Sequence, residues 1–94
     1  MRKLLWGGSF RRALRRFVKK NPGFDAAIEE TLGVLAEDPF DPRLGTHKLK
    51  GKLARSWACS AGYDLRIIFG FRKNKKTAED EILLFDIGSH DEVY

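Results

Sequence analysis

The segment 63–71, with the sequence YDLRIIFGF, most constrains what this chain can fold into. Its odd positions are all apolar, whereas its even positions include Asp64 and Arg66. Side chains of a strand point alternately to its two faces, so an apolar residue at every second position is typical of a strand with one buried face. The pattern therefore predicts a strand that covers a core with one face and carries two charged groups on the other.

The neighbouring segments predict further strands beside this one. Residues 56–61 are predicted to form a preceding strand, and residues 81–87 a returning strand after a polar turn. On the returning strand, Leu83, Phe85 and Ile87 are predicted to form the apolar face. The second half of the chain is therefore predicted to be a sheet with one face toward the core.

The first half of the chain has a helical period instead. After a short predicted strand at residues 4–6, apolar side chains recur with the spacing of two helices. Ser9 is predicted to cap the first helix, and Asn21 to end it and cap the second, which closes at Asp38. Two helices joined this tightly form an antiparallel hairpin with one shared apolar side.

These elements predict a single domain of the α+β class over residues 1–94. Its two layers are an N-terminal helical hairpin and a mostly antiparallel four-stranded sheet, in the order β-α-α-β-β-β. Cys59 is the only cysteine, which excludes an intrachain disulfide and favours a reducing compartment. No apolar run approaches the ~20 residues that a membrane span needs. We therefore expect a cytoplasmic protein with no membrane partner.

The charge of the chain, +5 in total, is segregated along the sequence. Residues 1–20 hold eight bases and no acid, and residues 43–55 hold five more bases and again no acid. Residues 24–38 carry only acids. Such segregation predicts a polyanionic partner or an acidic protein partner. The alternative is that the bases are solvated faces that keep the protein soluble.

The chain ends on GSHDEVY, which combines a helix signal with two groups that can move protons. Ser89 followed by Glu92 is a capping-box pattern, which predicts a helical turn over residues 90–94. Positions four apart on a turn share a side, so His90 and Tyr94 are predicted to meet. A neutral imidazole can accept a proton, as a general base must. The alternative is a surface histidine and a tyrosine that docks the terminus.

Three further polar residues are candidates for a site. Asp64 and Arg66 share the open face of the predicted sheet, where the alternative is a surface ion pair that contributes little. His47 lies in a basic loop and is unremarkable alone. Two histidines and one cysteine without close spacing do not make a zinc site. Trp57 and Cys59 are predicted to be core residues.

The reaction class follows from what is missing as well as what is present. The sequence contains no nucleophile motif, phosphate loop or dinucleotide fingerprint. RNA, however, can be cut by its own 2′-hydroxyl attacking the adjacent phosphate. That reaction needs from a protein only a base, an acid and cations that stabilise the phosphate, with no metal.

The predicted element order and two stretches, LKGKLARSWACSAGYDLRIIF and IGSHDEVY, resemble the RelE/ParE toxin superfamily. The closest resemblance is to the RelE and YafQ-type mRNA interferases of type II toxin–antitoxin pairs, and it is strongest from His47 to Tyr94. It implies a RelE-like fold and a metal-independent endoribonuclease without cofactor. It also implies cleavage of mRNA in the ribosomal A site and silencing by a cognate antitoxin.

The resemblance extends to individual residues. The YafQ-type pattern falls on His47, Asp64, His90 and Tyr94, and the RelE-type arginine falls on Arg66. The departures are Ser60, where the YafQ pattern has a histidine, together with Trp57 and Cys59, where the RelE pattern has lysines. Because of these departures, the assignment of acid and base stays open.

We expect His90 to be the general base or acid, Arg66 to stabilise the phosphate, and Tyr94 to orient the 2′-hydroxyl or stack on a base. Asp64 and His47 are expected to orient these groups or share the proton transfer. Four nearby bases are expected to contact the RNA backbone: Lys48, Lys50, Lys52 and Arg55.

Two other functions remain open. One is a non-catalytic, ParE-like inhibitor of DNA gyrase, and the other is a degenerate member that binds RNA or the ribosome without cutting. The SHDEVY ending favours cleavage, because binding alone requires no imidazole. An acidic antitoxin segment is expected to fold across the basic surface and the helices. A homo-oligomer is not expected without it.

Overall fold

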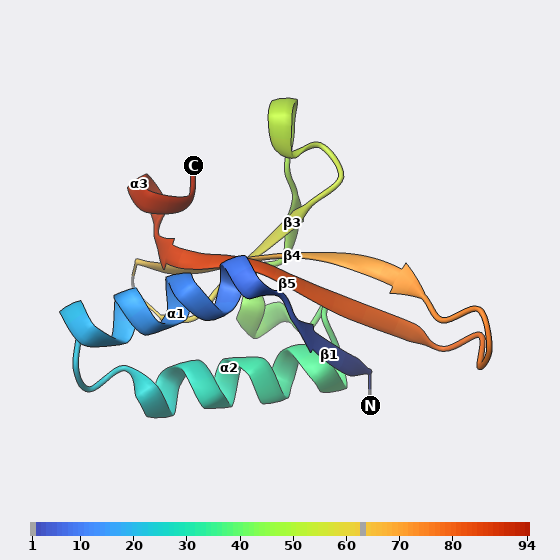
Figure 1. Ribbon diagram of the computed structural model, residues 1–94, viewed down its shortest axis with the longest axis horizontal. Helices are drawn as coiled ribbons and strands as arrows, with labels where there is room; N and C mark the ends of the chain where they lie inside the picture. The colour runs from blue at the N-terminus through green and yellow to red at the C-terminus, as the bar shows by residue number, and fades with distance from the viewer. Residues whose placement is uncertain (1, 63) are drawn as a thin grey trace.

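The computed structural model describes residues 2–62 and 64–94, with the side chain of Lys52 also outside the description. The elements follow in the order β1 (Lys3–Trp6), α1 (Gly8–Lys20), α2 (Asp25–Glu37), η1 (Pro42–Leu44), β2 (His47–Lys48), η2 (Gly51–Leu53), β3 (Trp57–Ser60), β4 (Leu65–Lys73), β5 (Asp80–Ser89) and α3 (His90–Val93). Figure 1 shows α1 and α2 beneath the sheet, while α3 and the loop that contains η2 project from its other side.

The sheet has the strand order β1-β5-β4-β3-β2. Strand β1 runs parallel to β5, and every other neighbouring pair is antiparallel. The predicted two-layer α+β architecture is therefore confirmed, although the sheet has five strands where four were predicted. The additional strand, β2, is only two residues long and lies at the edge. It is too short to produce an alternation of apolar and polar residues that the sequence would show. No helix in the described part of the chain has the length and apolar character for crossing a membrane.

The core lies between the helices and the lower face of the sheet. Helix α1 contributes Phe10 and Phe17, and β4 contributes Leu65, Ile67 and Phe69, all of them buried. The predicted apolar face of segment 63–71 is thus confirmed for Leu65, Ile67 and Phe69. The first residue of that segment lies outside the described part of the chain.

The helix boundaries differ from the prediction in two places. Gly7 rather than Ser9 caps α1, and the Ser9 hydroxyl instead donates to the carbonyl oxygen of Phe85 at 2.9 Å. Asn21 ends α1, but its side-chain amide donates back to the Phe17 carbonyl, so it does not cap the next helix. Helix α2 begins only at Asp25. Ser9 therefore makes a tertiary contact and Asn21 caps the end of α1, where both were predicted to be N-terminal caps.

The predicted apolar face of β5 is wrong for most of the strand. Its buried core residues are Ile82, Leu84 and Ile87, whereas Phe85 is 37% exposed. The cause is a β-bulge: Ile68 pairs with Asp86 while the next residue of β4 pairs with Leu84, which leaves Phe85 as the extra residue. One inserted residue reverses the alternation, so only the position after the bulge, Ile87, agrees with the prediction.

The prediction that Cys59 and Trp57 belong to the core is correct for the first and partly correct for the second. Cys59 is fully buried. Trp57 is half-buried and packs against the core. Its ring also contacts Phe40 and Phe71 at centroid distances of 5.3 and 5.7 Å, which forms an aromatic cluster.

Candidate functional site

The last turn of the chain is held by a complete capping box. The Ser89 hydroxyl accepts a hydrogen bond from the Glu92 backbone N–H at 3.3 Å, and the Glu92 carboxylate accepts one from the Ser89 backbone N–H at 2.8 Å. These bonds satisfy N–H groups that the first turn of a helix cannot satisfy itself. The predicted terminal turn is confirmed as α3. The two hydrogen bonds of the capping box fix its position relative to the end of β5.

Helix α3 brings His90 and Tyr94 into contact, as their spacing predicts. Their ring centroids are 4.6 Å apart with an interplanar angle of 66°. Both side chains are exposed, so the pair is accessible to a large substrate. The Asp64 carboxylate accepts a hydrogen bond from the His90 backbone N–H at 3.4 Å. Asp64 therefore ties the start of α3 to the start of β4 and contacts the backbone of His90 rather than its imidazole.

Arg66 lies on the upper face of the sheet, which we call the open face because α1 and α2 cover the other one. It pairs with Ser60 on β3 and Gly88 on β5, and it alternates with the buried Ile67. A Cβ at Gly88 would lie 3.1 Å from the Cβ of Glu92. The missing side chain at Gly88 therefore lets α3 lie close above the sheet, beside the arginine.

The positive charge of Arg66 acts on the phenol of Tyr94. Partial burial raises the pKa of Tyr94, and the positive charge of Arg66 opposes that rise. Imidazole and phenol are in contact on α3, and Arg66 lies on the open face opposite Gly88 near the end of β5. The Asp64 carboxylate holds the start of the helix.

His47 is not brought into this group. It is exposed on the edge strand β2 and pairs with Ala58, which in turn pairs with Ile68 on β4. Its side chain shares the open face but stands two strands from β4, which corresponds to roughly 10 Å. Its Nδ1 atom lies 3.2 Å from the carbonyl oxygen of Gly45. His47 therefore stands at the rim of the face.

The four predicted RNA-contacting bases have different surroundings. Lys48 follows His47 on a strand, so its side chain lies on the opposite face of the sheet from the imidazole. Lys50 and Arg55 are exposed in the loop around η2, which projects above the open face (Figure 1). The fourth, Lys52, has its side chain outside the described part of the structure.

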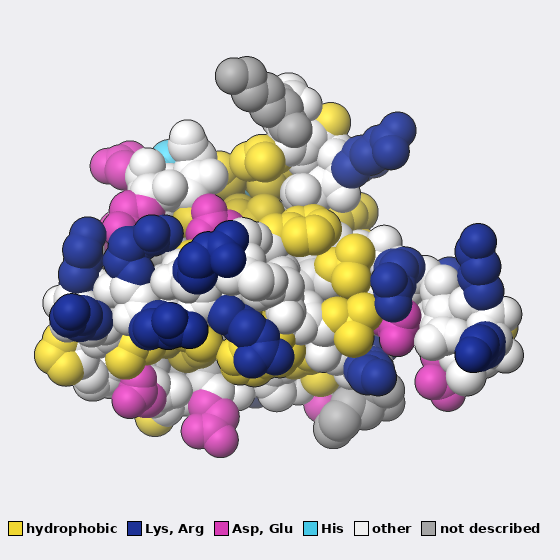
Figure 2. Space-filling view, in the orientation of Figure 1, with side chains coloured by type: hydrophobic (Ala, Val, Ile, Leu, Met, Phe, Trp, Pro, Cys, Tyr) yellow, Lys and Arg dark blue, Asp and Glu magenta, His cyan; other side chains and the backbone are white. Residues whose placement is uncertain are grey.

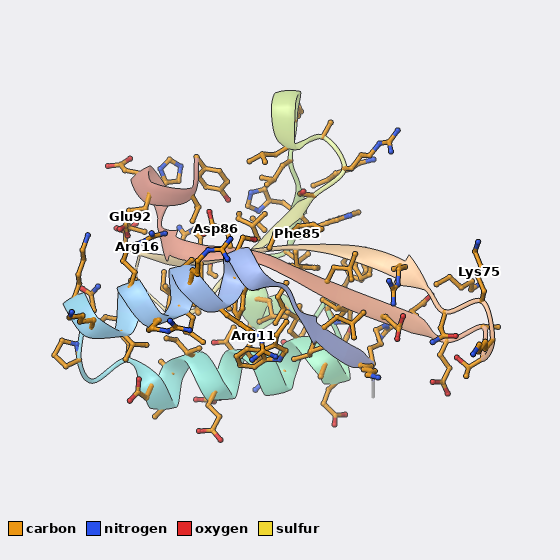
Figure 3. The ribbon with its side chains drawn as sticks, in the orientation of Figure 1. Arg11, Arg16, Lys75, Phe85, Asp86 and Glu92 are labelled. Atoms are coloured by element: carbon orange, nitrogen blue, oxygen red, sulfur yellow. The ribbon has the colours of Figure 1, made fainter. Side chains whose placement is uncertain are left out.

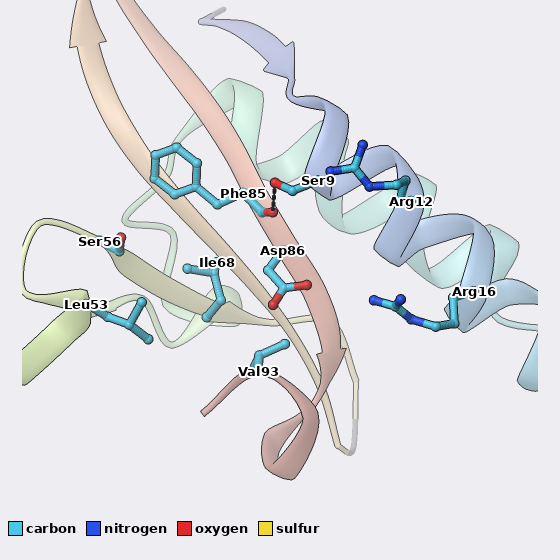
Figure 4. A pocket seen from close by; sticks show the side chains of 9 residues that line it. All are labelled: Ser9, Arg12, Arg16, Leu53, Ser56, Ile68, Phe85, Asp86 and Val93. Carbon is cyan, nitrogen blue, oxygen red and sulfur yellow. Dashed lines mark hydrogen bonds between the residues drawn. The ribbon is translucent and has the colours of Figure 1, made fainter.

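The open face contains a hollow of about 580 Å³ that sequence reasoning did not find. Figure 4 shows its lining: Ser9, Arg12 and Arg16 from α1, Leu53 and Ser56 from the loop around η2, Ile68 from β4, Phe85 and Asp86 from β5, and Val93 from α3. The lining comes from five separate segments. The acid-free run at residues 1–20 was visible in the sequence, but only the fold shows that part of it borders this hollow.

Basic side chains continue from the hollow along α1. Figure 2 shows a band of lysine and arginine side chains over this helix, and Figure 3 shows Arg16 near both Asp86 and Glu92. The hydrogen bonds from Ser89 lower the pKa of Glu92, and the charges of Lys20 and Arg16 lower it further. Helix α1 therefore stabilises the ionised capping carboxylate of α3 and presents cations beside the site.

Among residues 2–62 and 64–94, no group of three or more histidine, cysteine, aspartate and glutamate side chains could hold a metal ion. Cys59 is the only thiol, and burial raises its pKa to about 12. A thiol with so high a pKa is a poor nucleophile, because the thiolate is the reactive form. The groups available for chemistry on the open face are therefore the imidazole, the phenol, the guanidinium groups and the carboxylates.

No protein-family model matches the sequence, and no curated protein matches it. Solved structures do match. A copper-bound mutant toxin from Helicobacter pylori superposes with a TM-score of 0.73 and 26% sequence identity over 100% of both chains. YafQ from E. coli superposes with a TM-score of 0.79 and 11% identity over 100% of this chain and 99% of that one. The YoeB/ParE toxin from Agrobacterium tumefaciens gives a TM-score of 0.73 and 17% identity over 94% of this chain and 98% of that one.

The chain has the RelE/YafQ toxin fold. This confirms the fold that the two sequence stretches implied. YafQ itself is also known in a DinJ–YafQ toxin–antitoxin complex, which superposes with a TM-score of 0.76 at 12% identity. Within the RelE/YafQ toxin fold, α3 and the open face are the parts on which this chain carries its acid–base and cationic groups.

Proposed function

We propose that this protein is the toxin of a toxin–antitoxin pair and that it cleaves mRNA in the ribosomal A site in the cytoplasm. The observation that carries the proposal is the contact of His90 with Tyr94 on α3, which lies close above Gly88, the residue that pairs with Arg66 on the open face. An imidazole, a phenol and a guanidinium supply what transesterification by a 2′-hydroxyl requires. The toxin names of proteins with the same fold support the biological role.

The proposed reaction begins when the 2′-hydroxyl of one nucleotide attacks the phosphorus of the next phosphate. The 2′-oxygen–phosphorus bond forms, the 5′-oxygen–phosphorus bond breaks, and the products are a 2′,3′-cyclic phosphate and a 5′-hydroxyl. His90 serves as the base that takes the 2′-proton or as the acid that protonates the leaving oxygen. Arg66 stabilises the charge on the phosphate oxygens, and Tyr94 orients the 2′-hydroxyl or stacks on a base. No metal takes part in these steps.

Asp64 and His47 have supporting roles in this proposal. Asp64 positions His90 through its hydrogen bond to the backbone N–H at the start of α3. His47, at the rim of the open face, orients the RNA together with Lys50 and Arg55. Cations at the rim attract the RNA backbone and make its binding depend on salt.

We also propose that an acidic antitoxin silences the protein. Helix α1 has no acidic residue, and its exposed bases form a band beside the site. The DinJ–YafQ toxin–antitoxin complex supports an antitoxin partner, because YafQ has the same fold. An acidic segment that covered this band would also block the route of RNA to α3.

Cleavage of a reporter message in a translating extract tests the proposal. The chain should cut the message at defined positions when ribosomes are present, and cleavage should fall strongly when they are removed. A message with a single 2′-deoxynucleotide at a mapped site should stay intact at that site, because the attacking oxygen is missing.

Two other results would overturn the proposal. Intact mRNA together with gyrase trapped on DNA would indicate a ParE-like inhibitor. Intact mRNA with normal growth, when the protein is expressed without an antitoxin, would indicate a degenerate member that binds RNA or the ribosome without cutting it.

A further inference from the structure

The bulge in β5 places two consecutive side chains on the same face of the sheet. Asp86 pairs with Ile68 on the open face, and Phe85 is the unpaired extra residue directly before it. The Phe85 ring lies over Gly70 on the open face, because a Cβ at Gly70 would come within 2.9 Å of the ring. Bulges next to functional sites commonly re-aim a side chain in this way. Here the bulge brings an aromatic ring and a carboxylate to one hollow.

The hollow has the size and lining of a site for a small planar group. Its volume of about 580 Å³ lies within the roughly 300–1,000 Å³ of small-molecule sites. Ile68, which is 2% exposed, forms the apolar floor, and Leu53 and Val93 line it from the loop around η2 and from α3. Such walls suit the flat, weakly polar faces of a nucleobase.

Asp86 is the acceptor in this hollow. One of its oxygens accepts the backbone N–H of Ile87 at 2.9 Å. Within the described residues it makes no ion pair, although Arg12 and Arg16 border the same hollow (Figure 4). A carboxylate offers about four lone-pair sites, so Asp86 keeps capacity for two more donors. The arginines are placed to bind a phosphate that accompanies the base.

Guanine is the base whose edge fits this arrangement. Its Watson–Crick edge presents two adjacent donors, N1–H and N2–H, which a carboxylate accepts together. Adenine and cytosine present one amino donor beside a ring nitrogen acceptor, and uracil presents one donor between two carbonyl oxygens. Each of those three edges places an acceptor against the carboxylate, which is unfavourable.

We propose that the hollow between α1, α3 and the loop around η2 binds a guanine base, with Asp86 accepting from N1–H and N2–H. This inference rests on the proposed function, because it makes the guanine part of the RNA substrate. Ile68 and Asp86 lie two residues along their strands from Arg66 and Gly88, a distance of roughly 7 Å. A nucleotide in the hollow therefore neighbours the phosphate that Arg66 would stabilise.

Binding of mononucleotides to the full chain tests the inference without any cleavage step. Titrations with guanosine, inosine and adenosine monophosphate, followed by NMR or calorimetry, should give the tightest binding for guanosine. A bidentate base contact discriminates by about 1–3 kcal/mol, which is roughly 5–150-fold in affinity. Inosine lacks the 2-amino group and should lie between the other two nucleotides.

The variant Asp86→Asn should remove the preference for guanosine, because an amide cannot accept from both donors. Asp80→Asn is the matched control, because it makes the same change at the exposed first residue of β5, six residues before Asp86. This variant should keep the preference for guanosine. Thermal unfolding of both variants checks that they are folded. If Asp86→Asn fails to fold, the nucleotide series on the unaltered chain decides alone.

Equal affinity for the three nucleotides, or a guanosine preference that survives Asp86→Asn, would overturn this inference. Neither result bears on cleavage, which is read separately on the reporter message. A guanosine preference that depends on Asp86, found together with an intact message, would instead overturn the proposed function and leave the base site standing.

Discussion

The two faces of the sheet differ in what covers them as well as in polarity. On the face beneath, Leu65, Ile67 and Phe69 alternate without interruption and are buried by α1 and α2. On the open face the bulge of β5 adds Phe85 beside Asp86, and the side chains include Arg66. The face beneath is constrained by packing, since a shift of one residue would expose the whole core side of the strand.

The two helices do not cover the open face, and this face carries the groups that are available for chemistry. Its α3 end is covered only by a single helical turn that a capping box holds in place. We therefore expect substitutions on the two faces to have separate effects. Changes beneath the sheet should alter the free energy of unfolding, and changes above it should alter the rate of RNA cleavage.

The largest expected effect separates the two histidines of the open face. His90→Ala should lower the cleavage rate by about 10²–10⁴-fold, because it removes a group that moves a proton in the reaction. His47→Ala should have a far smaller effect, since His47 stands at the rim. Both side chains are exposed, so neither change should alter the melting temperature much. Equal losses of rate would place the proton transfer elsewhere.

The next prediction compares a phenylalanine on each face. Phe69→Ala should reduce the free energy of unfolding by about 3–5 kcal/mol, because it empties a fully buried position. Phe85→Ala should cost less, since that ring is 37% exposed. Urea denaturation of the two variants measures the difference. A larger cost for Phe85→Ala would mean that the hollow is part of the core.

The buried thiol gives the lower face a pH dependence of its own. Burial raises the pKa of Cys59 from 9.0 to about 12. Between these two values the unfolded chain has lost the proton that the folded chain keeps, so the unfolded state binds fewer protons. The free energy of unfolding therefore falls as the pH rises through this range, by about 1.4 kcal/mol per pH unit from this group.

Denaturation of the parent and of Cys59→Ala from pH 8 upward isolates the contribution of the thiol, because every other titrating group is common to both. The parent should lose stability more steeply than the variant above about pH 9. Parallel curves would show that the thiol does not stay protonated in the folded protein.

The smallest expected effect concerns how well ordered the last helical turn, α3, is. Ser89→Ala removes the side chain that caps α3 and should cost about 1 kcal/mol of local stability. Amide hydrogen exchange should become faster in α3 and stay unchanged in β4. Glu92→Gln is the control, because an amide oxygen can still accept from the Ser89 backbone. Unchanged exchange in Ser89→Ala would mean that other contacts hold the turn.

The sequence predicts those features of the fold that depend on local patterns. The alternation in segment 63–71 predicts β4, and the Ser89–Glu92 pair predicts α3 and the contact of His90 with Tyr94. These predictions succeed because the interactions involved lie within one strand or one turn. The start of α2 is predicted too early, because Asn21 caps the end of the preceding helix instead.

The bulge and the hollow could not be predicted in the same way. A bulge depends on the register between two strands, and nothing in the sequence of β5 shows that Phe85 lacks a partner on β4. The hollow depends on segments far apart in the chain, so Arg12 and Arg16 could be recognised as basic but not as neighbours of Asp86. Tertiary contacts decide both features, and a local pattern does not record them.

The central claim is that the α3 end of the open face cleaves RNA, and a pair of arginine variants tests it most directly. Arg66 lies on the open face opposite Gly88, whereas Arg43 makes an exposed ion pair with Asp41 at 2.9 Å. Cleavage of the reporter message by Arg66→Ala should be slower than by the parent by about 10²–10³-fold, as for the loss of a group that stabilises charge in the transition state. Cleavage by Arg43→Ala should match the parent. Equal cleavage by both variants and the parent would contradict the account.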